Sequence, residues 1–181
     1  TVFEIDNGTG GPEKIIVKNH DIRANQFMIA SLGDHSSFGY QFGYSRSSFS
    51  NNKRRFIFET GLEFSVFPYK EVNTKFWTFS YVMDIRHNRY FDSTLYEKIE
   101  EFLFGHKAET NLTFNQKWGR LRLGAEYHSY LHDFSLYNVS VDVEVDVRIT
   151  GGLSLNIYSF GALTRDQIFL PKGGATPQEV L

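Results

Sequence analysis

The sequence predicts an all-β protein, an antiparallel up-and-down transmembrane β-barrel with about eight strands visible as part of a larger barrel. Long segments alternate apolar and polar residues with a period of two, which puts the two kinds of side chain on opposite faces of a strand. No long helical pattern fits between these segments. Most of them exceed the roughly five or six residues of an ordinary strand and suit the roughly nine to eleven residues that cross a bilayer at a tilt.

The clearest alternation covers residues 137–150. One face of this segment is apolar and consists of Val139, Val141, Val143, Val145, Val147 and Ile149. The other face is polar and consists of Asn138, Ser140, Asp142, Glu144, Asp146 and Arg148. A charged face along the whole strand suits a water-filled or plugged barrel interior, and the valine face suits lipid.

The same period recurs in two other strong segments and in several weaker ones. The strong segments have the apolar sets Phe56, Phe58, Leu62, Phe64, Val66 and Trp77, Phe79, Tyr81, Met83, Ile85. Weaker alternation covers 38–45, 111–115 and 121–128. Together these patterns predict eight strands, at 22–32, 36–47, 53–67, 74–87, 106–118, 120–130, 137–150 and 153–165.

Turn chemistry supports these boundaries. Trp118 and Gly119 suit a two-residue hairpin loop, and residues 150–152 suit a three-residue loop with glycine available for positive φ. The connections 47–54, 87–105 and 130–136 are longer, with 67–73 intermediate, so short and long connections are expected to alternate. Outer-membrane barrels have this asymmetry. Within the longest connection, residues 95–102 form either a solvated loop with a hydrophobic anchor or a helical turn or two.

Composition narrows the function classes. The 181 residues suit one domain, and a net charge of -2 gives no basic excess for binding nucleic acid. The absence of cysteine excludes disulfides and zinc–cysteine modules. No apolar run reaches the roughly 18 residues of a membrane-spanning helix. The principal alternative is a soluble sheet sandwich, which also alternates but places its apolar face inward.

Five segments resemble a family of outer-membrane β-barrel proteins of Bacteroidota with unassigned function: 66–71, 117–121, 130–135, 152–156 and 165–177. The resemblance covers roughly 21–181 and implies an outer-membrane location, with no catalytic residues to transfer. We therefore expect an outer-membrane β-barrel domain over 21–181, incomplete at both ends. Residues 1–20 are expected to form a flexible or edge segment before it.

The polar faces predict a network of charges in the barrel interior, consisting of Glu109, Arg122, Glu126, His128, Asp142, Glu144, Asp146 and Arg148. A two-residue turn at 118–119 would pair Lys117 with Arg120 and set Glu109 opposite His128. In the next hairpin, Arg122 would lie near Glu144 or Asp146. Opposite charges in a column favour structural filling over a passage or ligand role.

Catalysis and metal binding have weaker support. His128, His132, Asp133 and Ser135 invite comparison with a serine hydrolase, but no G-x-S-x-G motif occurs. The histidines lack the spacing of a metal-binding helix, so we expect no metal and no cofactor. The sequence thus predicts a non-enzymatic outer-membrane barrel that acts as an envelope scaffold, complex subunit or small passage. Its expected partners are outer-membrane lipid and other envelope proteins, without nucleic acid. The alternatives are a membrane-embedded lipid hydrolase and a soluble β-sandwich or lipocalin-like binding protein.

Overall fold

The structure is a computed structural model that describes residues 2–6, 12–16 and 20–171. One antiparallel sheet contains eight strands: β3 (Asp21–Ser31), β4 (Ser36–Ser47), β5 (Asn52–Ser65), β6 (Lys75–Tyr90), β7 (Glu100–Gln116), β8 (Gly119–Tyr130), β9 (Asp133–Thr150) and β10 (Leu153–Thr164). Strands β1 (Val2–Asp6) and β2 (Pro12–Ile16) pair in a separate two-stranded sheet. Parts of the expected segment 1–20 and residues 172–181 of the expected domain lie outside the described residues.

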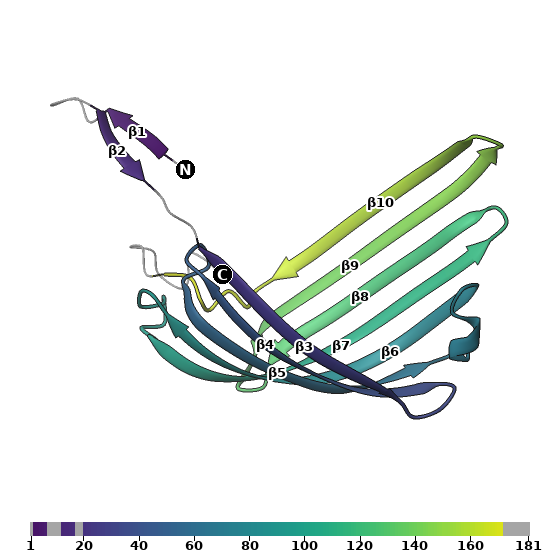
Figure 1. The fold of residues 1–181 in the computed structure, drawn as a ribbon, viewed down its shortest axis with the longest axis horizontal. Helices are drawn as coiled ribbons and strands as arrows, with labels where there is room; N and C mark the ends of the chain where they lie inside the picture. Colours follow the sequence, from purple (N-terminus) through teal and green to yellow (C-terminus); the bar gives the residue numbers. More distant parts are fainter. Residues whose placement is uncertain (1, 7–11, 17–19, 172–181) are drawn as a thin grey trace.

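Each strand of the large sheet pairs with its neighbours in sequence, so the topology is up-and-down. Figure 1 shows the strands side by side in a curved sheet. Within the described residues, the edge strands β3 and β10 do not pair with each other, and the sheet is open. The predicted all-β antiparallel up-and-down fold is confirmed. Residues 20–171 do not form the two packed sheets of a sandwich, because their eight strands belong to one sheet.

Three strands extend further than the sequence pattern predicted. β6 and β7 continue pairing as far as Arg89 and Glu100, so only 91–99 connect them and the helical turn considered for 95–102 is wrong. The added pairs are favourable, since His87 stacks on Phe102 with ring centroids 4.3 Å apart. β9 already starts at Asp133, which leaves a two-residue turn where a longer loop was expected.

The predicted alternation of short and long connections is also wrong. Connections 48–51, 91–99 and 131–132 lie at one end of the sheet, here called the β6–β7 end. Connections 32–35, 66–74, 117–118 and 151–152 lie at the other, the β5–β6 end. The added pairing of β6, β7 and β9 shortens the loops at the β6–β7 end, where long loops were expected. As a result each end has one long connection, 91–99 at the β6–β7 end and 66–74 at the β5–β6 end.

The connection 66–74 contains the 3₁₀ helix η1 (Tyr69–Glu71). A 2.9 Å ion pair joins Lys75 Nζ to Glu71, and this hydrogen-bonded contact holds the pKa of the Glu71 carboxyl below its usual range.

None of the helices in the described ranges has the length and apolar character needed to cross a membrane.

The register between β7 and β8 differs by two residues from the prediction. Lys117 and Trp118 form the turn, and Gly119 pairs with Gln116 as a strand residue. Gly119 has a φ of +149°, and a Cβ there would lie 1.8 Å from the Asp146 carbonyl oxygen. Glycine is therefore needed inside the strand rather than in the turn. A register shift of two residues leaves every side chain on the same face of the sheet. The polar side chains of β7 and β8 therefore still share one face, as predicted, but their directly opposite partners differ from the prediction.

The two faces of the sheet have inverted burial. Large apolar side chains on one face remain exposed, including Tyr81 at 50% and Leu62 at 59%. On the opposite face, Asp84 is only 3% exposed and His128 only 5%. We call these the apolar face and the polar face. The buried hydrophobic residues in the described ranges are few: Tyr90, Leu95, Leu103, Tyr130, Leu136 and Ile168.

Candidate functional site

The most buried group of charges lies on the polar face near the β6–β7 end. Arg86 Nε donates to Asp84 Oδ1 at 2.6 Å, and Arg86 Nη2 lies 2.8 Å from His128 Nε2. His128 Nε2 is also 3.2 Å from Asp84 Oδ2. A guanidinium can only donate and a carboxylate can only accept, so Nε2 can serve only one of these two partners at a time, according to the tautomer of the ring. We call Asp84, Arg86 and His128 the buried triad.

Gly105 brings the buried triad together across an intervening strand. Asp84 lies on β6 and His128 on β8, with β7 between them. Gly105 pairs with Asp84, and a Cβ at this glycine would lie 2.6 Å from Asp84 Oδ2 and 2.9 Å from His128 Nε2. A side chain on β7 would therefore occupy the space in which the two groups meet.

The segment after β10 covers the buried triad. Asp166 Oδ2 lies 3.5 Å from His128 Nδ1, the other ring nitrogen. Ile168 packs with Leu103, Tyr130 and Leu136 in a cluster of buried apolar side chains. Figure 1 shows this yellow segment turning across the end of the sheet. We call residues 165–171 the strap.

The far end of the strap is fixed to two loops. Leu95 N donates to the Leu170 carbonyl at 3.0 Å, and Asn51 Nδ2 lies 3.3 Å from the Phe169 carbonyl. Pro171 forms an isolated bridge with Thr94. These bonds tie the strap to the β4–β5 and β6–β7 connections, so it closes over the polar face at this end.

A second polar group continues the buried triad towards the strand ends. Arg55 Nε donates to Asn88 Oδ1 at 3.1 Å, and Asn88 Nδ2 donates to the Tyr90 hydroxyl at 3.2 Å. The Tyr90 hydroxyl donates in turn to Glu101. Asn88 is 2% exposed and Tyr90 1% exposed, so the centre of this network is shielded from solvent, and its polar groups bond to one another.

The charges at the β5–β6 end are more open. Arg122 Nη1 lies 3.2 Å from Glu144 Oε2, and the two residues are paired in register, so this predicted contact is observed. Asp146 is held instead by Arg120 Nη2 at 2.8 Å. The side chains of Arg120 and Arg122 are 40% and 49% exposed. We call these four residues the exposed ladder.

The remaining predicted network residues have different surroundings. Glu109 and Glu126 face each other in register, and Lys107 Nζ lies between them at 3.5 Å and 3.7 Å. The expected pairing of Glu109 with His128 is therefore wrong, because the β7–β8 register is shifted.

Two further members of the predicted network lie at less contacted positions. Asp142 pairs with Gly124, which leaves room for its carboxylate because a Cβ at this glycine would lie 2.4 Å from Asp142 Oδ1. Arg148 is exposed near the end of β9. Neither residue brings a reactive group to a partner in the described contacts.

The predicted network did not include five residues that contribute to these groups: Asp84, Arg86, Lys107, Arg120 and Asp166. Asp84 and Arg86 alternate with the apolar side chains of residues 77–85 in the sequence, and this period of two is the signal that could have found them. Their partner could not be found from the pattern, since it lies two strands away and reaches them only past Gly105.

The serine-hydrolase alternative receives no support from the contacts of its residues. Ser135 Oγ donates to Asp133 Oδ1 at 2.6 Å, within one strand. No hydrogen bond in the described part of the chain joins Ser135 to a histidine, and the His128 ring is occupied by the triad and the strap. Likewise, no group of three or more metal-ligating side chains is found among residues that the structure describes.

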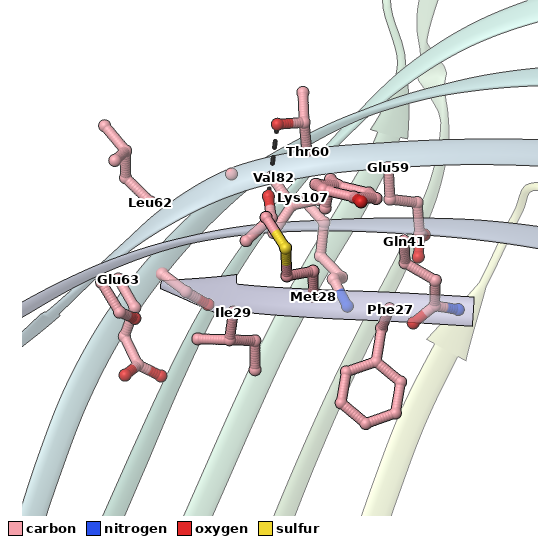
Figure 2. A pocket seen from close by; sticks show the side chains of 15 residues that line it. Phe27, Met28, Ile29, Gln41, Glu59, Thr60, Leu62, Glu63, Val82 and Lys107 are labelled. Atoms are coloured by element: carbon pink, nitrogen blue, oxygen red, sulfur yellow. Dashed lines mark hydrogen bonds between the residues drawn. The ribbon is translucent and has the colours of Figure 1, made fainter. Parts of the chain in front are cut away.

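The polar face is hollowed at the β3 edge, in a depression of about 270 Å³. Figure 2 shows Phe27, Ile29 and Glu63 on one side of the sheet, with Thr60 and Leu62 on the other. Phe27 and Ile29 are 68% and 67% exposed. This edge strand therefore carries exposed apolar side chains on the face where the central strands carry charges.

Comparisons with known proteins give no relative from which a site could be transferred. No protein-family model matches the chain, and no curated protein or solved structure matches it significantly.

Proposed function

We propose that this chain forms part of the wall of a non-enzymatic outer-membrane β-barrel, with the apolar face against lipid and the polar face towards the interior. Its function would be that of an envelope scaffold, complex subunit or small passage. The resemblance of the five sequence segments to Bacteroidota outer-membrane barrels supports the same assignment.

The observation that carries the proposal is the inverted burial of the two faces. Exposed apolar side chains continue across neighbouring strands, where Leu62 pairs with Tyr81 and Tyr81 pairs with Ala108. Soluble monomers rarely expose continuous apolar patches above a few hundred Å². In a bilayer these side chains contact lipid instead of water, so their exposure carries no hydrophobic cost. A bilayer also favours a sheet because neighbouring strands satisfy the backbone hydrogen bonds.

The polar face favours a scaffold or complex subunit among these functions. The charged groups of the buried triad and of the Arg55–Glu101 network bond to one another, and the strap reaches the triad through Asp166. A side chain that binds a substrate or transfers a proton must be accessible to its substrate or to solvent. The polar atoms of these two groups are instead bonded to other side chains of the protein. The charges therefore hold strands and strap in place.

Depth in the bilayer provides the test. Val143 lies mid-strand on the apolar face, and Ile149 lies near the end of β9. Val143→Arg should lower the free energy of unfolding by about 2–4 kcal/mol, and Ile149→Arg by about 1 kcal/mol or less, because the cost of arginine falls towards the interface. The measurement is a urea unfolding titration of the full chain in phospholipid vesicles. Equal costs at the two positions would contradict a bilayer around this face.

A further inference from the structure

Aromatic rings form a band across the apolar face near the β6–β7 end. The ring centroids of Tyr44 and Phe56 are 5.3 Å apart, those of Phe56 and His87 6.5 Å, and those of His87 and Phe102 4.3 Å. The band crosses β4, β5, β6 and β7. Aromatic bands of this kind are typical of the boundary between hydrocarbon and lipid headgroups.

The next row of residues beyond this band is basic. Arg54 on β5 pairs directly with Arg89 on β6. On the other side of β5, the register shift sets Arg46 opposite both Lys53 and Arg54, so Lys53 is the extra residue of a β-bulge. We call Arg46, Lys53, Arg54 and Arg89 the basic row.

The basic row has no carboxylate partner in the described part of the chain. The neighbouring acid, Glu100, pairs with Arg89 in register, but its carboxylate lies 2.7 Å from His87 Nε2. Arg54 lies over the Phe56 ring at 5.7 Å, and its Nε atom is buried without a hydrogen-bond acceptor. Two like charges directly opposite each other in a sheet repel, and a buried donor without an acceptor adds a further cost.

An anion between these side chains would offset the repulsion of their like charges. Guanidinium groups present parallel N–H donors that match the oxygens of a phosphate, and the arginines come from three neighbouring strands. The aromatic band beside the row offers an apolar surface for acyl chains. A ligand that carries a phosphate next to an apolar chain would fit both features, and a phospholipid is such a ligand.

We propose that the basic row binds the phosphate of an anionic phospholipid headgroup whose acyl chains lie along the aromatic band. This inference rests on the proposed membrane function and adds a specific lipid contact to it. Lys53 supplies a fourth positive charge at the rim of the site, and Arg46 lies over the Phe91 ring at 5.3 Å.

The test compares two lipids with the full chain in detergent micelles. Phosphatidylglycerol and phosphatidylcholine are titrated separately, and bound lipid is counted by native mass spectrometry. The parent chain should bind phosphatidylglycerol more tightly than phosphatidylcholine. The triple variant Arg46→Gln, Arg54→Gln, Arg89→Gln should weaken phosphatidylglycerol binding roughly 100-fold, about fivefold for each charge removed. Phosphatidylcholine binding should fall much less, because its choline cation offsets the attraction of the site for its phosphate.

A matched control removes three positive charges from the opposite end of the sheet. Lys70→Gln, Lys117→Gln and Arg148→Gln together should leave the preference intact. Where the first triple variant does not fold, Arg89→Gln alone, at an exposed position, should weaken phosphatidylglycerol binding about fivefold. Equal binding of the two lipids by the parent, or parent-like phosphatidylglycerol binding by the folded triple or single variant, would overturn the headgroup site.

Failure of the headgroup site is distinguishable from failure of the membrane function. The parent chain is also added to vesicles of phosphatidylcholine alone, and protease protection reports its insertion. Insertion without a phosphatidylglycerol preference contradicts only the headgroup site. Absence of insertion into these vesicles and into vesicles containing phosphatidylglycerol contradicts the membrane function, and the headgroup site with it.

Discussion

The buried triad and the exposed ladder contain similar charged groups on the same face but differ in solvent access. The Asp84 side chain is 2% exposed and that of Arg86 18%, whereas the side chains of Arg120 and Arg122 are 40% and 49% exposed. Water can replace a lost partner in the ladder and cannot do so in the triad. The same ion-pair chemistry should therefore be structurally essential at one end of the sheet and nearly dispensable at the other.

The largest effect is expected from removing the cation of the buried triad. Arg86→Met would leave Asp84 buried without its guanidinium and should lower the free energy of unfolding by about 3–5 kcal/mol. Urea titrations followed by tryptophan fluorescence measure this cost. Arg120→Met is the matched variant in the exposed ladder and should cost about 1 kcal/mol or less. Similar costs for the two variants would remove the distinction between the two groups.

An intermediate effect is expected at the glycine that lets the triad assemble. Gly105→Ala would place a methyl group between Asp84 and His128 and should cost about 1–3 kcal/mol through overpacking. Gly161→Ala is the control, since a Cβ at this strand glycine meets nothing within 4 Å. The same unfolding titration applies. If Gly105→Ala were as stable as Gly161→Ala, the contact across β7 would not hold the triad together.

The smallest effect is expected for Arg122→Ala. Its side chain is exposed and Glu144 keeps a second partner in Arg120 at 3.1 Å, so the cost should be about 0–1 kcal/mol. Ion flux through vesicles containing the variant should match that of the parent. A normal unfolding curve combined with loss of a measured flux or hydrolysis would instead assign the ladder a passage or catalytic role.

The difference between the two groups also marks how far the sequence could predict them. Period-two alternation predicts which side chains share a face, so Arg122 and Glu144 could be assigned to one column before their register was known. Strand boundaries at β4, β8 and β10 were close for the same reason. Alternation is read from consecutive residues, and the face of a side chain and the bounds of a strand depend mainly on those same consecutive residues.

The buried triad depends on contacts that alternation does not encode. Asp84 and His128 meet across an intervening strand because Gly105 has no side chain, and Asp166 reaches them from the strap. The exact partners in β7 and β8 likewise depend on the conformation of Gly119, which moved the turn by one residue and the register by two. Tight glycine contacts and bulges therefore decide the site, whereas composition and spacing decide the faces.

The central claim is that the apolar face contacts lipid while the polar face does not, and labelling adjacent residues tests it most directly. The chain contains no cysteine, so Val141→Cys and Asp142→Cys each introduce a single attachment site for a fluorophore, on the apolar and polar faces of β9 respectively. In vesicles, nitroxide groups on the lipid acyl chains should quench the label at 141 strongly and the label at 142 weakly. Equal quenching of both labels by aqueous iodide, with neither quenched by the lipid nitroxide, would contradict the assignment of this sheet to a membrane.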